Sequence, residues 1–213
     1  MEIYKKLLSH FGPQNWWPGD SPFEIAVGAV LTQNTNWGNV EAAIKNLKHA
    51  RVLCPKKLHD MPNDDLAKLI KPAGYFNLKA KRLKNFINYL INFYDGKIEN
   101  MLVKDTEILR RELLEVNGIG PETADSILLY ACNKKIFVVD AYTKRIFERA
   151  GVIDKGLDYY EIQEFITKNF KGDLQDYNEF HALIVALGKD FCRPKPRCEK
   201  CALNNICLFF IDK

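Results

Sequence analysis

Residues 113–125 limit the possible folds of this chain more than any other segment. An apolar pattern with helical spacing ends at Val116, and the turn Gly118-Ile119-Gly120-Pro121 follows it. The two glycines give the backbone the freedom that a sharp reversal needs. Pro121 suits the first turn of a new helix, where its missing N–H has no role. The segment therefore predicts two helices joined by a tight turn, whose backbone N–H groups favour an anion such as a phosphate.

Most of the remaining chain also has helical periodicity. No alternating run is long enough for a strand, and the apolar residues 136–139 are too few and lie between helices. The sequence therefore predicts an all-α fold. The expected helices cover residues 1–11, 22–32, 39–48, 80–93, 105–116, 123–131, 141–150, 159–170 and 177–188, with a broken helix pair over 55–70.

The length and charge of the chain exclude few functions. Its 213 residues are enough for one domain or two small ones with a substantial core. Lys and Arg number 31 against 27 Asp and Glu, so the net charge of +4 permits a local nucleic-acid-binding patch without requiring one. No apolar run is long enough to span a bilayer, and the N-terminus lacks a signal-peptide pattern. We expect a cytoplasmic monomer with no membrane contact.

Four cysteines are crowded into the C-terminal segment with the spacing Cys-x5-Cys-x2-Cys-x5-Cys. They are Cys192, Cys198, Cys201 and Cys207. In a reducing compartment such a group indicates metal binding more often than disulfides. Four thiolates within one short segment suit a [4Fe–4S] cluster. Zinc is the alternative, although zinc sites more often combine two Cys-x2-Cys pairs and this segment has one.

Three basic residues lie between the first two of these cysteines. Because a metal would fix both ends of this loop, Arg193, Lys195 and Arg197 would point outward and could contact phosphates. The metal would then have a structural role, which is to hold a basic loop in place.

The hairpin, a later aspartate and the cysteine spacing together resemble the endonuclease III superfamily of DNA glycosylases. The family pattern is Leu-x-x-hydrophobic-x-Gly-hydrophobic-Gly-x-Lys-Thr-Ala, followed later by a catalytic Asp and, near the C-terminus, by a [4Fe–4S] loop. In this chain Asp140 matches the aspartate, and Glu122 occupies the position of the lysine. The first gap between cysteines is one residue shorter than in the family's loop.

The resemblance implies two helical domains with the active-site cleft between them. Residues 22–134 would form a six-helix domain that carries the helix-hairpin-helix at about 113–125. Residues 1–21 together with 135–213 would form a second helical domain that carries the iron–sulfur loop at 192–207. The implied partner is double-stranded DNA that contains a damaged base.

The resemblance also implies which residues contact that DNA. In the family, a glutamine matched here by Gln33 enters the gap left by an extruded base, and a wedge matched by Tyr75 or Phe76 is inserted into the duplex. The basic run that includes Lys79 suits phosphates, although a solvated face explains it equally well, and Phe76 could be a core residue. The hairpin residues expected to hold the DNA backbone are Gly118, Ile119, Gly120 and Thr123.

Asp140 is the expected catalytic residue, although it could also be a simple N-cap of the following helix. In a glycosylase, a carboxylate at this place stabilises the positive charge that develops on the sugar and orients or deprotonates water. Bifunctional members of the family use the hairpin lysine as a nucleophile. Glu122 therefore implies a monofunctional enzyme without efficient lyase activity.

The tryptophans resemble the 3-methyladenine DNA glycosylase branch of the superfamily, in which aromatic side chains enclose the flipped base. Trp16 and Trp37 would form the sandwich, and Trp17 and Pro18 would shape the wall. A cationic base between aromatic faces gains cation–π attraction, and Glu122 would attract it further. The residues alone favour a simpler explanation, in which one tryptophan of the adjacent pair packs and the other covers the surface.

The expected function is base-excision repair by hydrolysis of the N-glycosidic bond of alkylated purines such as 3-methyladenine. Two alternatives stay open. One is an endonuclease III-type glycosylase and AP lyase that acts on oxidised pyrimidines or mismatched thymine. The other is a non-catalytic helix-hairpin-helix protein that binds DNA.

Overall fold

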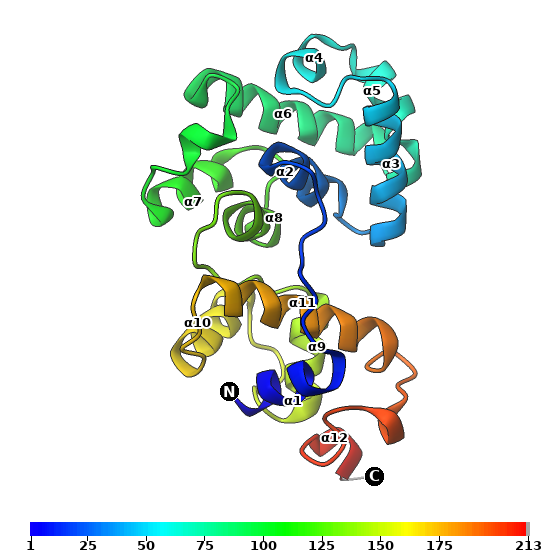
Figure 1. The fold of residues 1–213 in the computed structure, drawn as a ribbon, viewed down its shortest axis with the longest axis vertical. Coiled ribbons are helices and arrows are strands. Elements are labelled where there is room, and N and C mark those ends of the chain that lie inside the picture. The colour runs from blue at the N-terminus through cyan, green and yellow to red at the C-terminus, as the bar shows by residue number, and fades with distance from the viewer. Residues whose placement is uncertain (212–213) are drawn as a thin grey trace. The chain divides into compact units, whose positions relative to one another are not determined.

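The computed structural model describes residues 1–211, and these residues form helices and loops with no strand. The all-α prediction is therefore confirmed. The chain divides into two compact units, one formed by Pro18–Lys134 and the other by Met1–Trp17 together with the chain from Lys135 onward. Figure 1 shows the helices that make up each unit. Within residues 1–211, no helix is both long and apolar enough to pass through a lipid bilayer.

The Pro18–Lys134 unit is built around α2 (Pro22–Leu31). The Ser21 side chain caps this helix by accepting a hydrogen bond from the Glu24 N–H at 3.2 Å. Its apolar residues are buried almost all round, because α3, α6 and α8 contact it. The other elements of this unit are α3 (Trp37–His49), α4 (Pro55–Asp60), α5 (Asn63–Leu69), η1 (Lys71–Ala73), α6 (Phe76–Tyr94), η2 (Ile98–Met101), α7 (Thr106–Glu115), α8 (Pro121–Ser126) and the π-helical turn η3 (Ile127–Ala131).

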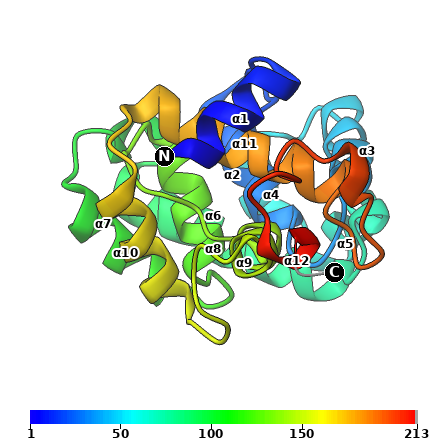
Figure 2. The same ribbon diagram turned by 90° about the horizontal axis from the view of Figure 1, so that it is seen from below.

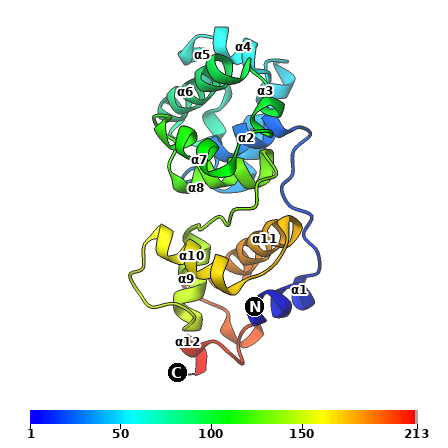
Figure 3. The same ribbon diagram turned by 90° about the vertical axis from the view of Figure 1, so that its left-hand side faces the viewer.

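The second unit is organised around α11 (Leu174–Asp190), which contacts α1 (Glu2–Phe11) and α9 (Ala141–Ala150). Figure 2 shows α1 lying along α11, and Figure 3 shows α9 and α1 flanking it. The core is aromatic. The centroid of the Phe180 ring lies 5.4 Å from the ring centroid of Tyr4 and 5.5 Å from that of Phe137. The remaining elements are α10 (Tyr159–Asn169), η4 (Cys198–Lys200) and α12 (Leu208–Ile211).

Among the helices that begin earlier than the periodicity predicts, α6 and α11 affect the site. α6 begins at Phe76 instead of residue 80, directly after Tyr75, whose left-handed φ of 44° ends the preceding turn. α11 begins at Leu174 instead of residue 177, because Asp173 and Asp176 form a capping box at its start.

Candidate functional site

The turn between α7 and α8 presents its backbone to solvent. Gly118 has a φ of 94°, and a Cβ at this position would lie 2.3 Å from Cγ of Arg82, so both conformation and space require glycine. The Ile119 side chain is 4% exposed and anchors the turn from inside. Gly120 is exposed, and a Cβ added there would have no neighbouring atom within 4 Å. The predicted hairpin is therefore present, with its backbone exposed at Gly120.

A buried ion pair joins the two helices of the hairpin. Arg110 on α7 donates from Nε to Asp125 Oδ1 at 2.7 Å and from Nη2 to Oδ2 at 3.0 Å. The Asp125 side chain on α8 is fully buried, and that of Arg110 is 13% exposed. This two-point contact fixes the angle between α7 and α8 and holds the turn in one shape.

Gln33 ties the loop after α2 to the hairpin. Its Nε2 donates to the Gly118 carbonyl at 2.9 Å and to Thr123 Oγ1 at 3.0 Å, and its Oε1 accepts from Arg82 Nη1 at 2.5 Å. Three residues predicted to contact DNA are thus brought together within the Pro18–Lys134 unit. The sequence did not indicate that Arg82 would hold this group together. Arg82 lies on α6, and Gln33, which it contacts, is 49 positions away in the loop after α2.

Tyr75 is the better placed of the two candidate wedge residues. Its side chain is 71% exposed at the start of α6, whereas that of Phe76 is partly covered. The left-handed backbone of Tyr75 follows Gly74, which also has a positive φ of 70°. An exposed aromatic side chain on such a fixed turn has the form that insertion between bases requires.

Lys79 lies in the protein interior, and the phosphate contact expected for it is not compatible with this position. Its side chain is 1% exposed, and Nζ donates to the carbonyls of Leu31 at 2.8 Å and Ala73 at 2.7 Å. Desolvation lowers the pKa of Lys79 to about 8. The reason is helical phase: because α6 already includes this position, Lys79 shares the inward stripe of Leu83 and Phe86 instead of extending the surface run of basic residues.

We expect Lys79→Met to destabilise the protein by about 1–3 kcal/mol near neutral pH, because two buried carbonyls lose their donor. The pKa of this lysine falls from 10.5 to about 8 on folding, so the folded state binds fewer protons between these values. The stability of the wild type therefore gains from rising pH over this range, and the gap to the variant should widen. Urea unfolding on both sides of the range measures it.

The matched control for Lys79→Met is Lys81→Met, which changes an exposed residue two positions later. The control is expected to leave stability within about 0.5 kcal/mol and to reduce the slope of log K against log salt for DNA binding by about 1. Lys79→Met is expected to leave that slope unchanged. A reduced slope in Lys79→Met would mean that its ammonium does reach a phosphate.

Asp140 both caps α9 and faces a histidine. Its Oδ1 accepts from the Thr143 N–H at 2.7 Å and from Thr143 Oγ1 at 2.9 Å, and its Oδ2 lies 3.6 Å from His181 Nε2. Burial alone would raise the pKa of the Asp140 carboxyl. The interaction with His181 and the donors of Thr143 outweigh that effect, so the pKa lies below its ordinary value. The predicted N-cap is confirmed, and the carboxylate stays charged in a largely buried place.

The segment before the tryptophan pair is held by a second residue of α11. The Glu179 carboxylate accepts from the Gln14 N–H at 2.6 Å and from the Asn15 N–H at 3.4 Å. The indole rings of Trp16 and Trp17 follow directly and meet edge to face, with centroids 5.5 Å apart. Glu179 and His181 were not predicted, because each looks in the sequence like an ordinary position on an amphipathic helix.

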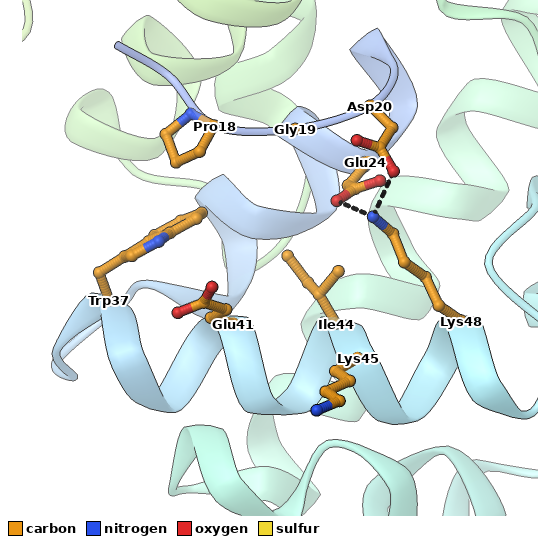
Figure 4. A pocket seen from close by; sticks show the side chains of 9 residues that line it. All are labelled: Pro18, Gly19, Asp20, Glu24, Trp37, Glu41, Ile44, Lys45 and Lys48. Carbon is orange, nitrogen blue, oxygen red and sulfur yellow. Dashed lines mark hydrogen bonds and ion pairs between the residues drawn. The ribbon is translucent and has the colours of Figure 1, made fainter. Parts of the chain in front are cut away.

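Pro18 and Trp37 line a cavity of about 330 Å³ within the Pro18–Lys134 unit (Figure 4). Ile44 adds an apolar wall. On the other side, Lys48 Nζ lies 2.6 Å from Glu24 Oε1 and 2.7 Å from Asp20 Oδ2, which pins the loop carrying Pro18 to α3. The remaining lining residues are Gly19, Glu41 and Lys45.

Glu122 does not line this cavity. It is exposed in the first turn of α8, where its carbonyl accepts from Ser126 Oγ at 2.7 Å. The structure thus brings together Pro18 and Trp37 of the predicted base pocket. It places Glu122 on the hairpin helix, and Trp16 and Trp17 belong to the other unit.

The four C-terminal cysteines have the chemistry of a thiolate metal site. Burial, and to a smaller extent the charges of neighbouring thiols, raise the pKa of Cys201 and of Cys207. The sulfur atoms are therefore close enough to interact electrostatically. Arg149 Nη1 donates to Cys192 Sγ at 3.5 Å. Among residues 1–211, no three Cys, His, Asp or Glu side chains form a preassembled metal site. The soft, all-sulfur donor set fits an iron–sulfur cluster or zinc, and Arg193, Lys195 and Arg197 of this loop are exposed.

The family model of the HhH-GPD superfamily base excision DNA repair proteins matches residues 27–171, from α2 through α10. The chain belongs to this superfamily. Family membership makes it a base-excision-repair DNA glycosylase that acts on DNA. The matched region contains the hairpin and Asp140, so the resemblance inferred from the sequence is confirmed.

Three similar proteins show the range of the HhH-GPD relatives. A protein of Methanocaldococcus jannaschii provisionally named as a DNA repair glycosylase is 53% identical over 209 residues, covering 97% of this chain and 94% of its own. Endonuclease III of Thermotoga maritima is 30% identical over 210 residues, covering 98% and 92%. The solved structure of Helicobacter pylori 3-methyladenine DNA glycosylase bound to 1,N6-ethenoadenine has a TM-score of 0.78 and 34% identity, covering 88% of this chain and 96% of that one.

Proposed function

We propose that this DNA glycosylase is monofunctional and releases alkylated purines, such as 3-methyladenine, that are flipped out of duplex DNA. The proposal depends mainly on one observation. The Asp140 carboxylate is charged and accepts two hydrogen bonds from Thr143, in a chain that has Glu122 at the family's lysine position. The chain therefore has the carboxylate for hydrolysis and lacks the amine for Schiff-base chemistry at the hairpin.

The proposed reaction uses Asp140 in two ways. As the C1′–N bond breaks, its electron pair leaves with the base and positive charge develops on the sugar, which the carboxylate stabilises. A water oxygen then bonds to C1′, and Asp140 accepts the proton that this water loses. Oδ2 is the oxygen for this work, because Oδ1 is already occupied by both donors of Thr143.

The choice of an alkylated purine rests on charge and on aromatic surfaces. Alkylation at a ring nitrogen makes the base cationic, which weakens the glycosidic bond before the enzyme acts. An indole face such as that of Trp37 attracts a cation, and the cavity beside it is also lined by the Glu41 carboxylate, whereas Asp20 and Glu24 are paired with Lys48. The 34% identity to a 3-methyladenine DNA glycosylase supports the same choice. Trp16, Trp17 and Glu122 are the other residues that we propose to contact the base.

DNA would be held by the hairpin backbone at 118–120, by the basic loop with Arg193, Lys195 and Arg197, and by Tyr75 as the wedge. Gln33 would enter the gap left by the extruded base. To do so, its amide must exchange the bonds it makes to Gly118, Thr123 and Arg82 for bonds to DNA. We propose that the protein does this as a monomer.

The proposed cofactor is a [4Fe–4S] cluster held by Cys192, Cys198, Cys201 and Cys207, which would fix the basic loop. Purified protein is expected to be brown and to contain about four iron atoms. Cys201→Ser is expected to lose the colour and the iron. Cys132→Ser is the matched control, because Cys132 is buried outside this segment. Zinc in place of iron, or unchanged iron in Cys201→Ser, would contradict the assignment.

A substrate panel tests the proposed function. Single-turnover base release would be measured on duplexes that carry 3-methyladenine, 7-methylguanine, an oxidised pyrimidine or a mismatched thymine, with and without alkaline cleavage of the abasic site. We expect release of alkylated purines and strand breaks only after alkali. Release of oxidised pyrimidines with an adduct trapped by borohydride would establish an endonuclease III-type lyase instead. DNA binding without any base release would indicate a non-catalytic module.

A further inference from the structure

Helix α11 brings a buried histidine to the carboxylate that the proposed reaction uses. The His181 side chain is 6% exposed, and its Nε2 lies 3.6 Å from Asp140 Oδ2. Its ring meets that of Phe137 at 85°, with centroids 6.3 Å apart, so packing fixes its orientation. The helix itself is fixed at its start by the capping box of Asp173 and Asp176. His181 therefore sits at a defined place beside one particular oxygen atom.

The two oxygens of Asp140 have different surroundings. Oδ1 accepts two hydrogen bonds from Thr143 on its own helix. Oδ2 faces His181 on α11, a helix that begins at Leu174, 34 positions after Asp140. A carboxylate that is 12% exposed needs a compensating partner to stay charged. For the reactive oxygen, the structure supplies that partner from α11.

We infer that His181 is a positioning residue for base excision, which aims Asp140 Oδ2 at the sugar and keeps this carboxylate charged until positive charge develops there. This inference rests on the proposed role of Asp140. His181 acts through Asp140, so it contributes to stabilising the charged transition state. It contributes little to the binding of undamaged DNA or of DNA whose abasic-site analogue carries no positive charge. The competing explanation is a histidine that only fills the core between α9 and α11.

Two substitutions separate these explanations. His181→Gln keeps a side-chain N–H donor, whereas His181→Met keeps most of the volume and removes the donor. If His181 only fills space, the two variants behave alike. If it acts on Asp140, His181→Gln retains most of the rate of base release and His181→Met loses about tenfold to a hundredfold, as expected when a buried charge loses the polar group that faces it.

A binding measurement gives a second readout that does not depend on turnover. Duplexes would carry either a pyrrolidine abasic-site analogue, which is cationic at the sugar position, or its neutral tetrahydrofuran counterpart. The wild type is expected to prefer the cation, because the charge of Asp140 faces it. His181→Met is expected to lose about tenfold or more of that preference, with unchanged affinity for the tetrahydrofuran duplex. That unchanged affinity also shows that the variant is folded.

The double variant shows whether the effect passes through Asp140. In an Asp140→Asn background, His181→Met is expected to change neither base release nor the preference for the cation any further. Full preference in His181→Met, or an equal additional loss in the Asp140→Asn background, would overturn the inference. A wild type that shows no preference for the cation and no base release would instead overturn the proposed function, so the two failures are distinguishable.

Discussion

Asp140→Asn is expected to lower the single-turnover rate of base release about 10²- to 10⁴-fold, the range typical of a group that transfers a proton in the transition state. The substitution removes the charge and keeps the shape. Asparagine is as good an N-cap as aspartate, so the bonds to Thr143 and the start of α9 should survive. The variant therefore separates the catalytic role of Asp140 from its structural one.

The control for this measurement is Asp154→Asn, which removes an exposed carboxylate from the same unit. It is expected to leave the rate within about twofold, as for surface substitutions away from a site. Asp140→Asn should bind a duplex with the neutral tetrahydrofuran analogue about as tightly as the wild type does. Equal rates in Asp140→Asn and wild type would remove Asp140 from the mechanism.

Asp125→Ala is expected to destabilise the protein by about 3–5 kcal/mol, because it leaves the Arg110 guanidinium buried without its carboxylate. The pair joins α7 and α8 by two hydrogen bonds in a place where Asp125 has no exposed surface. Urea unfolding near neutral pH, followed by circular dichroism, measures the loss. Because the hairpin depends on this pair, DNA affinity should fall under conditions in which the variant is still folded.

The exposed pair of Lys68 and Asp65 provides the control, with N and O atoms 2.9 Å apart and both side chains more than half exposed. Asp65→Ala is expected to change stability by about 0–1 kcal/mol. A second comparison is Arg110→Met with Asp125→Leu, which removes both charges and should be less destabilising than Asp125→Ala alone. If the single and double variants lost the same stability, desolvation of Arg110 would not be the cause.

The features that could be predicted from the sequence are those with local causes. The hairpin follows from Gly118, Gly120 and Pro121, because backbone freedom and the fixed φ of proline act within a few residues. The N-cap by Asp140 has the same origin. The cysteine group is equally local. For these parts, residue type and spacing carry nearly all of the information.

The features that could not be predicted depend on pairs that are distant in the chain. A helix that begins at residue 80, as the periodicity predicts, leaves Lys79 at the surface, whereas α6 starts at Phe76 and buries it. Arg82 meets Gln33 across 49 positions. His181 meets Asp140 only after α11 has packed on α9. No periodicity within one segment reports which residue a buried side chain will face in another.

The second unit combines the N-terminal helix with a part of the chain made much later, and this affects the order of folding. Tyr4 hydroxyl donates to Asp176 at 2.9 Å across 172 positions. During synthesis, the contiguous Pro18–Lys134 unit can fold first, as is general for domains that emerge early. The α1 helix cannot pack until α11 has been made. Until then Ile3 and Leu7, which are almost fully buried in the finished protein, have no permanent cover. The α1 helix is thus made well before the helix on which it packs, and we expect closure of such a long-range contact to be slow.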